Sequence, residues 1–295
     1  MYAQFFGTFL LSHNVVTKDQ LLSALGKKSS QHMKLGTLAI MKGYMTANEV
    51  DNVIISQTHN DCRFGDLAVR EGYLTQEQVD ELVKTQYPDF LLLGQTLVDE
   101  GYITNTQLET LIVDYESENE LTDLDYSNEK QDNLDRILAN FFHTTDVAAD
   151  EYNASYMRLL FNDLTRFIGD DFTPLCFNPC KEYPVNYCVS QTIHGDLSAK
   201  VYLDMPETTC ISFASRYVNE EFTEFDEYVQ ASLEDFLNLH NGLYNVNISN
   251  TLGKELTLEA PEVVSDELID LSDSSYLLQI MYPFGIVNFI FELKK

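Results

Sequence analysis

Four stretches of the chain align without a gap: FGTFLLSHNVVTKDQLLSAL (residues 6–25), LGTLAIMKGYMTANEVDNVI (35–54), FGDLAVREGYLTQEQVDELV (64–83) and LGQTLVDEGYITNTQLETLI (93–112). The glycine in second place recurs every 29 residues, at Gly7, Gly36, Gly65 and Gly94. A threonine keeps the same interval, at Thr17, Thr46, Thr75 and Thr104. Constant spacing over four copies is typical of a tandem repeat, so residues 1–115 are predicted to form an array.

Each copy is predicted to fold as a helix–turn–helix. The first helix ends at a residue suited to left-handed backbone, namely Asn14, Gly43, Gly72 or Gly101. The recurring threonine then begins a second helix, and a Gln or Glu follows three places later: Gln20, Glu49, Gln78 and Gln107. This pair is a capping box, in which each side chain bonds the backbone N–H of the other residue.

The rest of the chain does not repeat. Residues 116–145 are acidic and are predicted to be a partly helical linker to a second domain, residues 146–295. In that domain the patterns predict helices at 151–169, 208–218 and 225–243, and strands at 185–193, 197–203, 276–282 and 286–293. Hairpin turns between these strands predict a mostly antiparallel sheet. The expected fold class is α+β: an all-α array followed by a two-layer α/β domain.

Net charge argues against one class of partner. The chain has 18 basic and 47 acidic residues, a formal charge of −29. Residues 116–295 hold 10 of the basic and 33 of the acidic residues, so −23 of that charge lies there. Nucleic-acid binding relies on clustered Lys and Arg, so no nucleic-acid partner is expected. The acidic residues suit either a basic protein partner or a solvated surface.

The sequence also argues against membrane insertion and against several kinds of catalytic or binding site. The chain has no apolar run of 18 residues and its first residues lack signal-peptide features, so we expect a cytoplasmic protein without membrane insertion. Cys176 and Cys180 have no histidine near them in sequence, so no metal site is expected. His194 and His240 have no recognisable nucleophile partner and are interpreted as surface or capping residues. A glycine-rich phosphate loop is absent.

The array resembles the N-terminal, MshEN-type domain of type II secretion and pilus ATPases. Two 24-residue motifs separated by five residues carry the resemblance: Lys34-Leu-Gly36 to Gln57, and Arg63-Phe-Gly65 to Gln86. The resemblance implies a cyclic di-GMP site in which Lys34 and Arg63 contact phosphate or guanine and Gln57 and Gln86 close the site. The first and fourth copies lack the cation, so a helical protein-interaction array is the alternative.

A second resemblance lies on the helix predicted at 225–243. Asp235 and Asn238 stand three apart and so share one helix face, and Gly242 follows four residues later. This order, after a hairpin and a short helix, resembles the CheC/CheX phosphatases of chemotaxis, whose signature is Glu-x-x-Asn-x-x-x-Gly. One such helix is present, as in the CheX type. The aspartate replaces the family's glutamate and is one methylene shorter.

The CheX resemblance implies a hydrolase acting on the phosphoaspartate of a response-regulator receiver. Asn238 would orient the attacking water and Asp235 would anchor the receiver, with Mg²⁺ supplied by that receiver rather than bound by this chain. The array would then be a regulatory or targeting input. The alternative is a catalytically silent CheX-like module that binds a receiver or dimerises through an exposed sheet edge, coupled to an array that senses cyclic di-GMP or a protein.

Overall fold

The computed structural model describes residues 2–28, 31–85, 87, 89–119, 141, 151–196, 198–265 and 268–294. The chain divides into two compact units, Met1–Ile137 and Leu138–Lys295. The predicted linker, 116–145, lies outside the described residues except for 116–119 and Phe141, and the helix α8 continues to Glu118.

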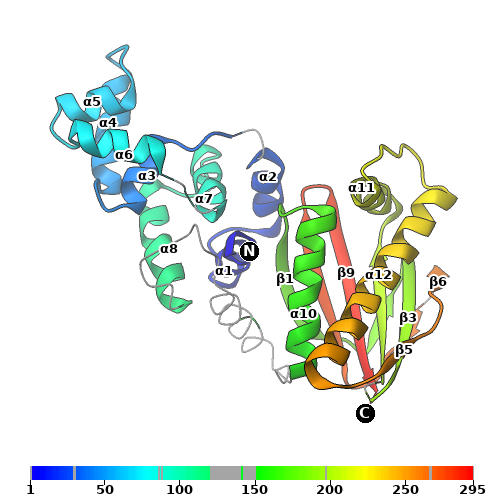
Figure 1. Ribbon diagram of the computed structural model, residues 1–295. Coiled ribbons are helices and arrows are strands. Elements are labelled where there is room, and N and C mark those ends of the chain that lie inside the picture. The colour runs from blue at the N-terminus through cyan, green and yellow to red at the C-terminus, as the bar shows by residue number, and fades with distance from the viewer. Residues whose placement is uncertain are drawn as a thin grey trace. The chain divides into compact units, whose positions relative to one another are not determined.

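The first unit is helical and follows the repeat (Figure 1). Its helices are α1 (Tyr2–Ser12), α2 (Lys18–Lys28), α3 (Leu35–Met41), α4 (Ala47–Gln57), α5 (Phe64–Arg70), α6 (Gln76–Lys84), α7 (Asp89–Asp99) and α8 (Asn105–Glu118). The four capping boxes are confirmed, since Thr17, Thr46, Thr75 and Thr104 each exchange hydrogen bonds with the residue three places on. The helix ends are confirmed too: Gly43, Gly72, Gly101 and Asn14 all have positive φ.

The recurring glycines are explained by packing within each copy. A Cβ atom added at Gly36 would lie 2.8 Å from Val50 Cγ1, and one at Gly94 would lie 2.5 Å from Leu108 Cδ1. Gly65 faces Val79 in the same way, at 3.1 Å. In these three copies the partner is the residue 14 places later, on the second helix. The glycines therefore let the two helices of a repeat approach closely.

The second unit is an antiparallel sheet with helices against one face (Figure 1). Its helices are α10 (Glu151–Asp163), which continues into the π-helical turn η1 (Leu164–Ile168), α11 (Glu207–Val218) and α12 (Glu227–Leu252). Its strands are β1 (Thr173–Pro179), β2 (Glu182–Pro184), β3 (Tyr187–Gly195), β4 (Ser198–Met205), β5 (Leu256–Leu258), β6 (Glu262–Ser265), β7 (Leu268–Asp270), β8 (Ser275–Tyr282) and β9 (Gly285–Lys294).

The strand order of the main sheet is β1-β8-β9-β4-β3-β5, with β6 also paired to β3. All the pairings described are antiparallel, so the predicted α+β class is confirmed. The helices α10 and α12 run side by side across one face of the sheet (Figure 1). The other face is packed by residues of the small β2–β7 ribbon, including Tyr183 and Ile269.

Candidate functional site

The helix α12 carries the predicted Asp235, Asn238 and Gly242. It starts at the N-cap Asp226, whose carboxylate accepts hydrogen bonds from the backbone N–H groups of Tyr228 and Val229. The side chains predicted to point inward are buried: Val229, Leu233, Phe236 and Leu237. Burial of this stripe fixes the helix against the sheet and so determines which residues point outward.

The outward face of α12 presents Asp235 and Asn238, both exposed, with Gly242 half-buried one to two turns further on. A Cβ atom at Gly242 would meet nothing within 4 Å among the described residues, and its φ is not positive. In that part of the chain, neither packing nor backbone geometry requires glycine there. The exposed apolar side chains Tyr228 (65% exposed) and Val246 (58%) lie on the same helix, before and after these residues.

Asp235 is held by a phenol from the neighbouring helix. The hydroxyl of Tyr217, in the last turn of α11, donates to Asp235 Oδ2 at 2.6 Å. Burial, reinforced by this hydrogen bond, raises the pKa of Tyr217, so the phenol stays protonated and remains a donor at neutral pH. The charge of the adjacent Glu234 acts on a different tyrosine. The pKa of Tyr187 on β3 is raised by burial first and by the charge of Glu234 second.

Asn238 is held from the opposite side, by the sheet. Its Oδ1 accepts a hydrogen bond of 2.8 Å from Nε2 of Gln191 on β3. Gln191 is 1% exposed and shares its sheet face with Val189 and Ile193. Sequence reasoning missed both Gln191 and Tyr217. The signal for Gln191 was a polar residue at an apolar register position of a strand, whereas Tyr217 carried no comparable signal.

His240 was interpreted wrongly as a surface or capping residue. Its side chain is 1% exposed, and its Nδ1 lies 2.7 Å from Oδ2 of the buried Asp163 on α10. The ring of Tyr156 packs edge-on against it, with centroids 4.7 Å apart. The reason is the length of α12, which continues well beyond His240 and keeps this position on the buried face. His240 and Asp163 thus connect α12 to α10.

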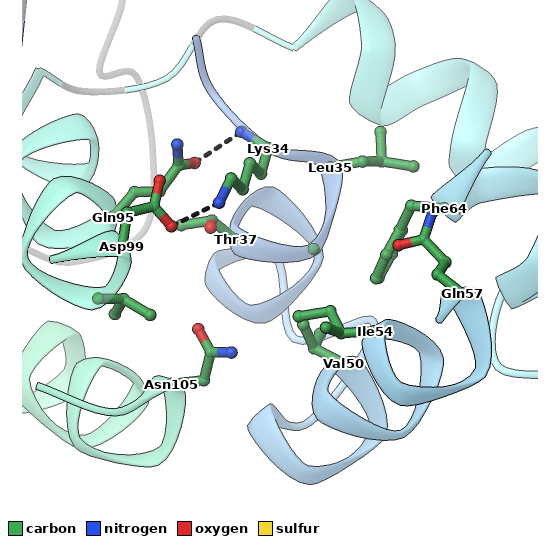
Figure 2. A pocket seen from close by; sticks show the side chains of 12 residues that line it. Lys34, Leu35, Thr37, Val50, Ile54, Gln57, Phe64, Gln95, Asp99 and Asn105 are labelled. Carbon is green, nitrogen blue, oxygen red and sulfur yellow. Dashed lines mark hydrogen bonds and ion pairs between the residues drawn. The ribbon is translucent and has the colours of Figure 1, made fainter. Parts of the chain in front are cut away.

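The residues predicted to bind a nucleotide in the array come together only in part. Lys34, Gly36 and Gln57 line a pocket of about 360 Å³ between α3, α4 and α7 (Figure 2). Its walls are completed by apolar and amide side chains, among them Val50, Ile54, Phe64, Val98, Gln95 and Asn105. Arg63 is an exposed N-cap residue and Gly65 packs on Leu35 and Val79, so neither lines this pocket. Gln86 lies outside the described residues.

The cationic group of this pocket already has a partner. Figure 2 shows Lys34 turned toward Gln95 and Asp99, with its Nζ 2.5 Å from Asp99 Oδ1. The backbone N–H of Lys34 donates to Gln95 Oε1 at 2.6 Å, and Gln95 Nε2 donates to the carbonyl of His32. An anionic ligand would have to compete with Asp99 for the ammonium group.

Within the described part of the chain, no helix is long and apolar enough to cross a membrane. Over the same residues, no three or more His, Cys, Asp or Glu side chains form a group that could hold a metal ion.

The site lies in a region that matches a known family model. Residues 187–285 match the model described as chemotaxis phosphatase CheX. This region contains Gln191, Tyr217, Asp235, Asn238 and Gly242. No curated protein matches the chain.

Several solved structures are similar to about half of this chain. A chemotaxis protein CheX from Desulfovibrio desulfuricans is 13% identical, with a TM-score of 0.40 over 49% of this chain and 100% of its own. A CheC-like superfamily protein from Shewanella sp. PV-4 is 15% identical, with a TM-score of 0.43 over 49% and 97%. A complex described as CheX-CheY-BeF3-Mg²⁺ from Borrelia burgdorferi contains a chain 15% identical, with a TM-score of 0.41 over 49% and 99%.

Proposed function

We propose that the second unit hydrolyses the phosphoaspartate of a response-regulator receiver in chemotaxis or a related two-component pathway. One observation carries the proposal. Asp235, Asn238 and Gly242 share the outward face of α12, inside the region that matches the chemotaxis phosphatase model. Both polar side chains are exposed, yet each is oriented by a residue outside the helix, Tyr217 or Gln191. Exposed side chains held in this way suit contact with a second protein.

In this reaction the protein would position the water and the receiver and would form no covalent bond itself. A water oxygen forms a bond to phosphorus in line with the bond to the aspartate oxygen, which breaks and leaves the receiver with a free carboxylate. The proton lost by the water passes to the phosphate product or to solvent. Asn238 would orient that water and Asp235 would pair with a receiver lysine. The Mg²⁺ that offsets phosphoryl charge would come with the receiver.

The shorter Asp235 supports the runner-up, a catalytically silent module that binds a receiver or a second copy. A misplacement of about 1 Å can cost on the order of 100-fold in rate. The hydrogen bond from Tyr217 argues for an ordered carboxylate all the same. Turnover decides between the two functions.

The test is the decay of the phosphoaspartate of an acetyl-phosphate-loaded receiver, with and without the full chain. We expect faster decay with the wild-type protein and a loss on the order of 100-fold with Asn238→Ala, because only the water-orienting amide is removed. Asn250→Ala, at an exposed asparagine on the same helix, is the matched control and should retain wild-type turnover. No acceleration by the wild type across several receivers, or full turnover by Asn238→Ala, would refute the phosphatase.

For the array we propose a regulatory role in which the pocket around Lys34, Gly36 and Gln57 takes cyclic di-GMP. The support is that these three residues line one pocket with both apolar walls and amide groups. Ligand at 100 times its dissociation constant adds about 2.7 kcal/mol to the stability of the folded state. We therefore expect cyclic di-GMP to raise the melting temperature of the wild type, and to do so less for Lys34→Ala. No shift at high concentration would leave protein interaction as the role of the array.

A further inference from the structure

A chain of hydrogen-bonded side chains runs beneath the outward face of α12. Gln191 Nε2 donates to Asn238 Oδ1 and to the backbone carbonyl of Glu259, both at 2.8 Å. Asn241 Nδ2 donates to Gln191 Oε1 at 2.8 Å, and Tyr156 donates its hydroxyl proton to Asn241 Oδ1 at 2.7 Å. Gln191, Asn241 and Tyr156 are all buried, whereas Asn238 is exposed. The network therefore reaches the surface at Asn238.

The assignment of donors and acceptors in this hydrogen-bond network follows from its backbone member, the carbonyl of Glu259. A carbonyl oxygen can only accept, so the group of Gln191 that meets Glu259 must be the NH₂. The second proton of that NH₂ can bond only an acceptor, which makes the atom of Asn238 in contact with it the oxygen. The oxygen of Gln191 must in turn accept from the NH₂ of Asn241. The amide orientations are therefore set by chemistry and not by the choice of similar atoms.

Asn238 consequently keeps its oxygen against the sheet and directs its NH₂ outward. We propose that Gln191 is a positioning residue that locks the Asn238 amide so that its N–H groups, rather than its oxygen, face the phosphorylated partner. The inference rests on the proposed phosphatase function, because it assigns Gln191 a role in that reaction through Asn238. An asparagine on an exposed helix face without such a partner would present either end of its amide.

Gln191→Glu tests the proposal with little change of shape. The carboxyl group that this substitution introduces has no proton when ionised and a single one when neutral, which the carbonyl of Glu259 accepts. In both forms no donor is left for Asn238, so Asn238 turns its NH₂ inward and presents its oxygen. We expect turnover to fall by about tenfold or more while affinity for a beryllofluoride- and Mg²⁺-loaded receiver stays within about twofold. In an Asn238→Ala background the same change should have no further effect on the residual rate, since Gln191 acts through Asn238.

The chain offers a matched control. Gln279 on β8 donates to Asn288 Oδ1 on β9 at 3.0 Å, and Asn288 Nδ2 donates to the carbonyl of Asp204. Register and alternation place this second glutamine–asparagine pair on the sheet face away from α12. Gln279→Glu removes the donor of this second pair and should therefore destabilise the fold without lowering turnover. Equal losses of turnover in both variants would reduce Gln191 to a structural role.

Side-chain amide exchange measured by NMR decides the orientation without reference to catalysis. In the wild type we expect protected NH₂ protons on Gln191 and rapidly exchanging ones on Asn238; in Gln191→Glu the Asn238 protons should become protected. Protected Asn238 protons in the wild type would overturn the positioning. Absent turnover with the expected exchange pattern would instead count against the phosphatase, so the two failures are distinguishable.

Discussion

The helical glycines of this protein differ in whether the structure has room for an added methyl group. At Gly36 an added Cβ would lie 2.8 Å from Val50 Cγ1 and 3.1 Å from Phe64 Cζ. Val50 is β-branched and buried, so it has little rotamer freedom with which to move away. At Gly26 and Gly242 the same atom would meet nothing within 4 Å among the described residues. The repeat glycines thus serve the fold, whereas no contact in the described structure accounts for the missing side chain of Gly242.

Gly36→Ala should lower the free energy of unfolding of the array by about 1–3 kcal/mol, because overpacking of a buried contact exceeds the gain in helix propensity. Gly26→Ala in α2 is the matched control and should raise stability by up to about 1 kcal/mol. Urea unfolding followed by circular dichroism measures both. A Gly36→Ala variant as stable as Gly26→Ala would contradict the packing explanation.

The site residues that could be predicted from sequence are those that share one helix. Asp235, Asn238 and Gly242 lie on one helix, and the helical period alone places residues three, four and seven apart on one face. Tyr217 and Gln191 come from other elements, 18 and 47 residues away from their partners. Those contacts depend on how α11, α12 and β3 pack together, which local patterns do not encode. The positioning groups therefore emerged only from the structure.

Among the helices and strands, boundaries were predicted correctly where a local sequence signal marks the end of a helix. The capping threonines and the left-handed glycines of the array mark its helix boundaries with separate chemical signals. The helix predicted at 225–243 was wrong at its end, because α12 continues to Leu252 and stops at Gly253, which has positive φ. The predicted end lies one residue after Gly242, yet a helix interior tolerates one glycine at a cost of about 1 kcal/mol. The extension carries the exposed Val246.

The strand β1 was not predicted, and its position explains why. Pro174 and Pro179 lie within Thr173–Pro179 and weaken a strand prediction, because proline lacks the N–H that a central strand needs. The structure places β1 at the edge of the sheet, where β8 is its one partner among the described strands and such residues are tolerated. The strands β2 and β7 are three residues each, too short to produce a recognisable alternation.

At the scale of the whole molecule, each unit has its own buried core and the acidic charge is uneven. Phe6, Phe90 and Tyr115 pack together in the array, whereas Phe161 and Phe213 are buried in the second unit. The second unit, residues 138–295, holds 8 basic and 25 acidic residues, so −17 of the −29 formal charge lies there. A partner approaching α12 therefore meets a unit of strongly negative net charge, which favours a basic docking face.

This charge predicts how association with a receiver responds to ionic strength. Because salt screens attraction between exposed charges beyond roughly 10 Å at 0.1 M, affinity for a receiver with a basic docking face should fall as salt is raised. Titrations at several sodium chloride concentrations measure the dependence. Affinity that is unchanged or increases with salt would contradict an electrostatic contribution to docking.

Gly242 allows a direct test of whether the outward face of α12 docks a phosphorylated receiver, as we propose. The measurement is calorimetric titration of the full chain with a receiver loaded with beryllofluoride and Mg²⁺, comparing wild type, Gly242→Ala, Gly242→Leu and the control Gly26→Ala. Because a Cβ at position 242 would meet no described atom within 4 Å, Gly242→Ala should raise the free energy of unfolding by about 0.5–1 kcal/mol. We expect affinity nevertheless to fall, by about tenfold for alanine and further for leucine, and to stay unchanged for Gly26→Ala. Wild-type affinity in both Gly242 variants would contradict docking at this face.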